Sequence, residues 1–133
     1  MSRSEDSPSD FIVFRTPAKR DDRLDPARLY AQALDLVGKV HFVLEHTAAR
    51  FYLRDRLDRA ATAVAVRFAR AESELKSNRW RSYREALVVI TDVVTMLDII
   101  DRQKVTTEDQ ALTEARALAR SLLTDVRPLA ALG

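Results

Sequence analysis

Apolar residues recur at steps of three and four in four successive segments of this chain, which is the period of an α-helix. The clearest row, within residues 50–76, runs through Leu53, Leu57, Ala60, Val64, Phe68, Ala71 and Leu75. The 133 residues include only two glycines and four prolines, so few positions interrupt a helix. The sequence therefore predicts an all-α protein, an up-down-up-down four-helix bundle with a flexible N-terminal leader.

Residue types at the helix ends predict where two of the helices begin. Asp25 is a suitable N-cap for the first helix, and Pro26 is favoured in its first turn. Thr107 and Gln110 have the spacing of a capping box at the start of the fourth helix. Pro128 is expected to end that helix or to follow its end.

The predicted domain organisation has three parts. Residues 1–24 are polar and charged and form the leader, residues 25–128 form the bundle, and residues 129–133 form a tail. The leader contains four consecutive apolar residues, Phe-Ile-Val-Phe at 11–14. We expect this segment to pack on the surface of the domain, and the alternative is that it docks on a partner.

Composition excludes several classes of function. Cysteine is absent, which excludes disulfides, a thiol nucleophile and a cysteine zinc site. The glycines, Gly38 and Gly133, do not form a phosphate-binding loop. The sequence has no signal-peptide pattern and no apolar run long enough for a bilayer, so we expect a cytoplasmic protein that does not contact membranes.

Side chains that could support catalysis or metal binding are few. His41 and His46 are the two histidines, and no Glu-x-x-His motif occurs. We interpret His41 as a packed or hydrogen-bonded residue, and Asp98 and Asp101 as solvated or salt-bridged residues. The sequence thus predicts a protein that is not an enzyme, with no catalytic residues, no metal and no cofactor.

Basic residues are concentrated in the middle of the chain. The net charge is +2, but residues 50–104 carry twelve basic and eight acidic groups. A helix of residues 50–76 places four arginines along one flank, and two more alternate with Trp80 in the segment "SNRWRSYR". Because the guanidinium fork suits phosphate, the predicted contacts with RNA or DNA are Arg56, Arg59, Arg67, Arg70, Arg79 and Arg81.

Two alternatives bear on this prediction. Trp80 and Tyr83 continue an apolar row, so we place both in the core rather than on a base-stacking surface. Acidic residues lie among the arginines and offer them ion-pair partners. The arginines are therefore consistent with a structural role as well as with nucleic-acid binding.

Small and apolar residues on two helices predict contacts between subunits. The side of residues 50–76 opposite the core stripe carries small residues where charge would be usual. The next predicted helix is capped by Ser77 or Asn78 and runs to about Gln103, and its apolar rows cover about 200° of the helix. We therefore predict a homo-oligomer whose interface includes Thr62, Ala65, Val66, Ala69, Val89, Val93 and Met96.

The middle of the chain resembles a known family of four-helix bundles, which includes ribosomal-RNA intervening-sequence proteins and the Avd accessory proteins of diversity-generating retroelements. The resemblance covers about residues 27–126. It is carried by "LRDRLDRAATAVAVRFARA" (53–71) and "KSNRWRSYREALVVITDVVTMLDII" (76–100), flanked by "ARLYAQALDLVGKVHFVLEHT" (27–47) and "KVTTEDQALTEARALARSLL" (104–123). Ala65, Arg67 and Ala71 stand where the intervening-sequence branch tends to have Pro, Asn and Gly, which favours the Avd-like branch.

The resemblance implies a ring, typically a pentamer, that has no catalytic residues and binds a reverse transcriptase and nucleic acid through a basic surface. Two functional hypotheses follow. The first is an accessory protein that binds nucleic acid or a nucleic-acid enzyme. The second is a structural or adaptor oligomer that binds a protein partner and uses its arginines for ion pairs.

Overall fold

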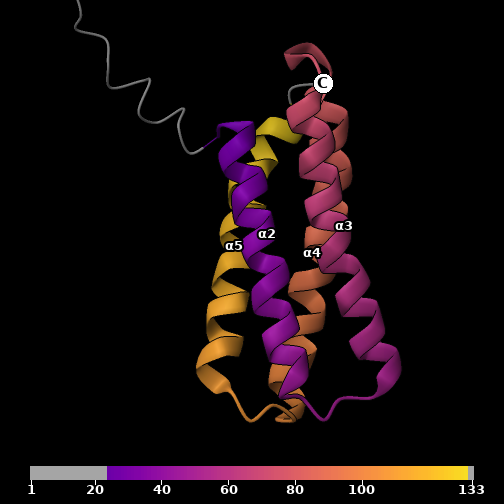
Figure 1. Cartoon of the computed structure of the whole chain (residues 1–133), viewed down its shortest axis with the longest axis vertical. Helices are drawn as coiled ribbons and strands as arrows, with labels where there is room; N and C mark the ends of the chain where they lie inside the picture. Colours follow the sequence, from indigo (N-terminus) through magenta and orange to yellow (C-terminus); the bar gives the residue numbers. More distant parts are fainter. Residues whose placement is uncertain (1–23, 132–133) are drawn as a thin grey trace, which may run out of the picture.

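The computed structural model describes residues 24–131, in which four long helices follow one another along the chain. They are α2 (Pro26–Glu45), α3 (Phe51–Ser73), α4 (Arg79–Gln103) and α5 (Asp109–Ala130), and the short 3₁₀ turn η2 (Lys76–Asn78) joins α3 to α4. Figure 1 shows the helices side by side along the long axis of the molecule. The predicted Phe-Ile-Val-Phe segment and the rest of residues 1–23 lie outside the described residues, as do residues 132–133.

The helices are arranged as a bundle in which neighbours along the chain are also neighbours in space. Helix α2 packs against α3 and α5, and α4 packs against the same two helices. The prediction of an all-α four-helix bundle is therefore confirmed.

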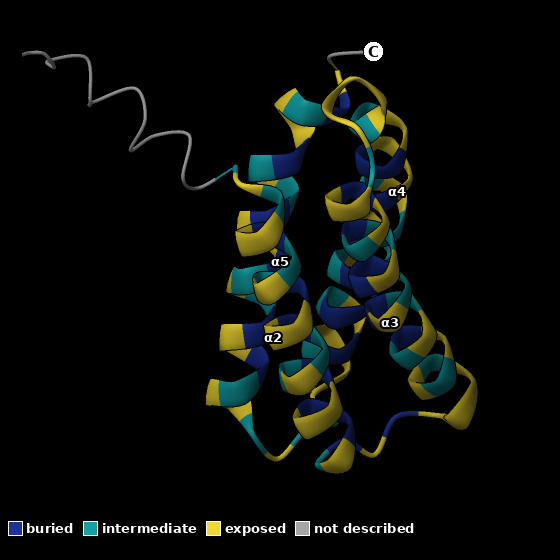
Figure 2. Cartoon of the chain, turned by 45° about the horizontal axis from the view of Figure 1, so that its top comes forward, coloured by how far each residue is buried: buried dark blue, intermediate teal, exposed yellow. Residues whose placement is uncertain are grey.

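Each helix turns its apolar face inward, so the buried residues line the centre of the bundle and the exposed residues face outward (Figure 2). Phe68, Leu36, Ile90 and Leu122 represent the four helices in this core, and none of them has exposed surface. Full burial of one such side chain contributes about 1.5–3 kcal/mol. The core row of α3 differs from the prediction in two places. Ala61 is fully buried while Ala60 is half-buried, and Leu75 lies beyond the end of α3 and is 75% exposed.

The helix starts confirm one prediction and contradict another. Asp25 occupies the N-cap position of α2 and Pro26 is its first residue, as predicted, but the Asp25 side chain makes no capping hydrogen bond. The capping box at Thr107 and Gln110 is wrong, because α5 begins only at Asp109. The Thr107 hydroxyl instead donates a hydrogen bond to the carbonyl of His46 at 3.3 Å, and the Gln110 amide donates to Glu114 at 3.0 Å.

The two connections at the lower end of Figure 1 explain why Thr107 does not cap α5. Thr47 and Thr106 form an isolated antiparallel bridge. The amide of Ala48 donates to the carbonyl of Val105 at 2.9 Å, and the amide of Thr107 donates to the carbonyl of His46 at 2.9 Å. These bonds between the α2–α3 and α4–α5 connections hold Thr107 in the connection, outside α5.

The predicted helix end at Pro128 is also wrong, because α5 continues through this residue to Ala130. Proline removes one backbone donor from the helix, which normally disfavours continuation. Two tertiary contacts favour the final turn. Ala130 is buried, and the guanidinium of Arg84 donates to its carbonyl at 3.3 Å.

Candidate nucleic-acid interface

The four arginines predicted along the flank of α3 all have polar partners within the bundle. Arg56 donates a hydrogen bond to the hydroxyl of Tyr52 at 2.9 Å. Arg59 is 79% exposed, and its Nε lies 3.1 Å from a carboxylate oxygen of Asp55, one turn earlier on the same helix. Such exposed pairs are weak and leave the guanidinium accessible to solvent.

Arg67 and Arg70 share one carboxylate on the neighbouring helix. The Nε of Arg67 lies 3.1 Å from Glu85 Oε1, and Nη1 of Arg70 lies 3.5 Å from the same oxygen. The Arg67 Nε is buried, and its N–H does not align on the carboxylate as a hydrogen bond despite the short distance. These contacts join α3 to α4 and occupy two of the arginines predicted to bind nucleic acid.

The turn between α3 and α4 and the start of α4 are rich in basic residues, although Glu74 in this turn accepts a hydrogen bond from the Ser82 hydroxyl at 2.7 Å. Residues 76–84 include Lys76, Arg79, Arg81 and Arg84 and contain no aspartate or glutamate. Within residues 24–131, no carboxylate oxygen lies within 4 Å of these four cations. We call this group, together with Trp80, the α3–α4 basic surface.

Two members of the α3–α4 basic surface are oriented by helix ends. The Nε–H of Arg79 donates to the carbonyl of Ala71 in the last turn of α3, at 2.9 Å. Arg84 donates to Ala130 in the last turn of α5. Both guanidinium groups therefore lie at negative ends of helix dipoles, where a cation is stabilised.

Trp80 contacts two cations of this surface, and its predicted place in the core is wrong. Its side chain is half-buried, and the guanidinium carbons of Arg84 and Arg81 lie 4.9 Å and 5.4 Å from its ring centroid. Distances below about 6 Å give cation–π attraction. Trp80 thus positions two arginines, and it belongs to the first turn of α4, where the core has ended.

Tyr83, one turn further along α4, does lie in the core as predicted. It is 4% exposed, and its ring makes an edge contact with Phe68 at a centroid distance of 6.0 Å. Its hydroxyl has no hydrogen-bond partner within the described residues. Burial raises the pKa of this hydroxyl above its ordinary value of 10.0, although the nearby Arg79 acts in the opposite direction.

The residues predicted to contact another subunit fall into two groups. Ala65, Val93 and Met96 are at most 8% exposed and belong to the core of the chain itself, so their prediction as surface residues is wrong. Val89 is half-buried and packs against that core. The others are accessible on the outer side of α3: Thr62 and Val66 are exposed, and Ala69 is half-buried.

The histidine and aspartate residues form polar contacts. Nε2 of His41 lies 2.6 Å from Asp58 Oδ1, which agrees with a hydrogen-bonded histidine. Asp98 binds Arg116 and Arg120 of α5 at 2.8–3.0 Å, so its interpretation as a salt-bridged residue is confirmed. In the described part of the chain, no group of three or more acidic or histidine side chains is placed to hold a metal ion.

The sequence pattern singles out Arg79 and Arg81 as contacts but not Lys76 and Arg84. The signal that identifies all four is the absence of acidic residues between positions 76 and 84.

No family model, curated protein or solved structure matches this chain. Among residues 24–131, the helices lack the combination of length and apolarity that crossing a bilayer requires.

Proposed function

We propose that this protein is a non-enzymatic accessory protein that binds nucleic acid through the α3–α4 basic surface. The observation that carries the proposal is the grouping of Lys76, Arg79, Arg81 and Arg84 without a carboxylate partner among the described residues. Cations that have no carboxylate partner among residues 24–131 are available to phosphate groups, and release of counterions from the nucleic acid drives such binding.

The arrangement of Trp80 supports phosphate contacts rather than base stacking. Arg81 and Arg84 lie over its ring, so the aromatic group holds guanidinium forks at the surface. Arginine forks bind two phosphate oxygens at once. The proposed mode is therefore recognition of the backbone, with little dependence on base sequence.

The resemblance of residues 27–126 to Avd-like proteins supports an accessory role and makes a reverse transcriptase a candidate protein partner. We further propose that the chain forms a ring, with the exposed residues Thr62 and Val66 of α3 in the contact between subunits. A ring would repeat the α3–α4 basic surface around one axis and so increase the charge presented to one nucleic acid.

A filter-binding titration with structured RNA at several salt concentrations tests the nucleic-acid proposal. The double variant Lys76→Gln/Arg81→Gln should bind more weakly, and its salt slope should be smaller by about 1 for each phosphate group that is no longer bound. The matched control is Arg102→Gln/Lys104→Gln, which removes two exposed cations at the opposite end of α4. Equal affinities for the two double variants would contradict a localised surface.

Light scattering tests the ring. A mass near the 15.1 kDa of one chain at micromolar concentration would contradict it. Val66→Glu should reduce the mass of the assembly, because it places a charge in the proposed contact on α3. Val88→Glu is the control, since Val88 is also exposed but lies on α4.

The ion pairs of α3 favour a second candidate, the structural or adaptor oligomer. Arg59, Arg67 and Arg70 each have a carboxylate partner in the chain, which is expected if their role is structural. Changing all three to glutamine separates the candidates. Loss of assembly with unchanged affinity for RNA favours the adaptor, whereas loss of affinity in an intact assembly favours the accessory protein.

A further inference from the structure

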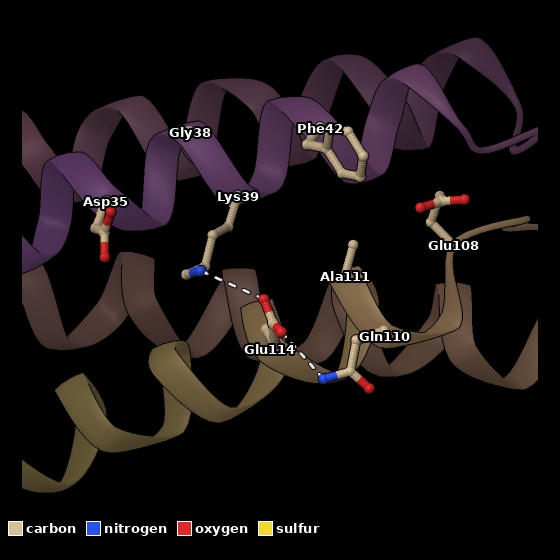
Figure 3. Close-up of a pocket in the computed structure, with 8 residues that line it drawn as sticks. All are labelled: Asp35, Gly38, Lys39, Phe42, Glu108, Gln110, Ala111 and Glu114. Atoms are coloured by element: carbon tan, nitrogen blue, oxygen red, sulfur yellow. Dashed lines mark hydrogen bonds and ion pairs between the residues drawn. The ribbon is translucent and has the colours of Figure 1, made fainter.

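An open groove lies between α2 and the first turns of α5, at the opposite end of α5 from the contact between Arg84 and Ala130. Its volume is about 450 Å³. Figure 3 shows residues of α2 facing residues at the start of α5 across this groove. The residues that line it are Asp35, Gly38, Lys39, Phe42, Glu108, Gln110, Ala111 and Glu114.

The middle of the groove is apolar and accessible. Phe42 is 43% exposed, which is unusual for a phenylalanine beside a well-packed core. Ala111 lies across from it on α5 (Figure 3). Gly38 adds no side chain, and a Cβ built there would meet no atom within 4 Å. An apolar side chain therefore has room beside Phe42.

The rim of the groove is acidic. Lys39 is its single cation, and Nζ lies 3.5 Å from Glu114, which also accepts a hydrogen bond from Gln110 at 3.0 Å. Asp35 and Glu108 lie toward the two ends of the groove (Figure 3). Neither has a cation within 4 Å among residues 24–131. The groove thus fits an apolar segment that has basic residues beside it.

The same chain contains a segment of this kind. Residues 11–14 are Phe-Ile-Val-Phe, and the six residues that follow, "RTPAKR", include three cations and no acidic residue. We propose that residues 11–14 dock in the α2–α5 groove of their own chain, with residues 15–20 along its acidic rim. This proposal is independent of the proposed function.

The length of the intervening chain permits this docking. Phe42 lies sixteen residues beyond Pro26, which corresponds to about 24 Å along α2. Asp25 lies eleven residues beyond Phe14, and an extended chain of that length spans about 36 Å. The linker therefore reaches the groove without full extension. Attachment to the same chain also gives the segment a millimolar effective concentration at the groove, which favours it over a second copy.

Gly38 provides a specific reporter for the test. Labelling the full chain with ¹⁵N-glycine gives two amide resonances. One comes from Gly38 in the groove, and the other comes from Gly133, which is 95 residues further along the sequence. The variant Phe11→Ser/Phe14→Ser should shift the Gly38 resonance and leave that of Gly133 unchanged. A synthetic peptide of residues 9–20, added to this variant, should restore the original Gly38 position in a saturable titration.

Charge variants test the acidic rim in the same titration. Asp35→Asn and Glu108→Gln, introduced into the Phe11→Ser/Phe14→Ser chain, should each weaken binding of the peptide about two- to fivefold. Asp92→Asn on α4 removes the same charge away from the groove and should leave the affinity unchanged.

Three outcomes would overturn the proposal. The first is an identical Gly38 resonance in the original chain and in the serine variant. The second is a peptide that does not restore that resonance. The third is a difference that disappears on dilution of the original chain, because this would assign the docked segment to a second copy. Circular dichroism of the serine variant excludes a change in folding as the cause of a shift.

Discussion

Glu85 neutralises two arginines of the proposed nucleic-acid interface, so its substitution should change stability and affinity in opposite directions. In Glu85→Gln, Arg67 and Arg70 lose the carboxylate that lies 3.1 Å and 3.5 Å away. The side chains are 30–54% exposed, and such partly solvated pairs contribute about 0.2–1 kcal/mol each. We therefore expect the free energy of unfolding to fall by about 1 kcal/mol.

The same substitution releases two guanidinium groups beside the α3–α4 basic surface. If both then bind phosphate, the slope of log affinity against log salt steepens by about 1 to 2. Each additional phosphate group bound makes the decrease of affinity between 50 and 200 mM salt about three- to fourfold larger. Urea denaturation measures the first effect, and filter binding with structured RNA measures the second.

Asp92→Asn is the matched control for Glu85→Gln. It removes one negative charge from the same helix, two turns later, where no cation lies within 4 Å among residues 24–131. If both variants have the same salt slope, the released arginines do not bind phosphate. If Glu85→Gln also lowers the mass of the assembly, the arginines serve the contact between subunits, and the reasoning is refuted.

Three further predictions concern the core and its links. Phe68→Ala should lower the free energy of unfolding by about 3–5 kcal/mol, because Phe68 is fully buried. Val66→Ala should change the free energy of unfolding of a monomer by no more than about 0.5 kcal/mol, because Val66 is exposed. Urea titration measures both values. Tyr83→Phe should be neutral or stabilising at pH 7, because it removes a buried hydroxyl that has no hydrogen-bond partner among the described residues. Because the pKa of Tyr83 is raised in the folded protein, ionisation of its hydroxyl destabilises the fold only as the pH rises above 10. The free energy of unfolding, measured by urea titration, should therefore fall less at alkaline pH in the phenylalanine variant than in the original protein. Asp98→Asn should cost about 1 kcal/mol, since this carboxylate binds two arginines of α5, and a melting temperature equal to that of the original protein would contradict it.

Local periodicity predicts the helices because each of them needs one apolar face. The spacing of apolar residues that forms such a face can be recognised within a single stretch of the sequence. The row containing Leu57, Val64 and Phe68 is buried for this reason. The helix ends are harder to predict, since they depend on contacts between distant segments. The partner of Thr107 is the carbonyl of His46, 61 residues away in the sequence, and no local pattern identifies it.

For a related reason, the wide apolar belt of α4 wrongly predicts Val93 and Met96 as contacts between subunits. Its two adjacent rows suggest more apolar surface than one bundle covers, and hence a second subunit. Helix α4 packs against both α3 and α5, however, and this environment buries Val93 and Met96 within one chain. A broad belt therefore carries information about a neighbouring subunit only where its residues remain exposed, as Val66 does on α3.

The contacts of the arginines of α4 distinguish those that have a structural partner from the one that we most expect to bind phosphate. A cation at a helix N-terminus is unfavourable because it faces the positive end of the dipole. Arg79 and Arg84 avoid this cost by reaching to the C-terminal carbonyls of α3 and α5. Arg81 has no such carbonyl contact within the described residues and is held only against Trp80, at 5.4 Å. Arg81 therefore has fewer structural contacts than Arg79 and Arg84, and it is the arginine of α4 that we most expect to bind phosphate.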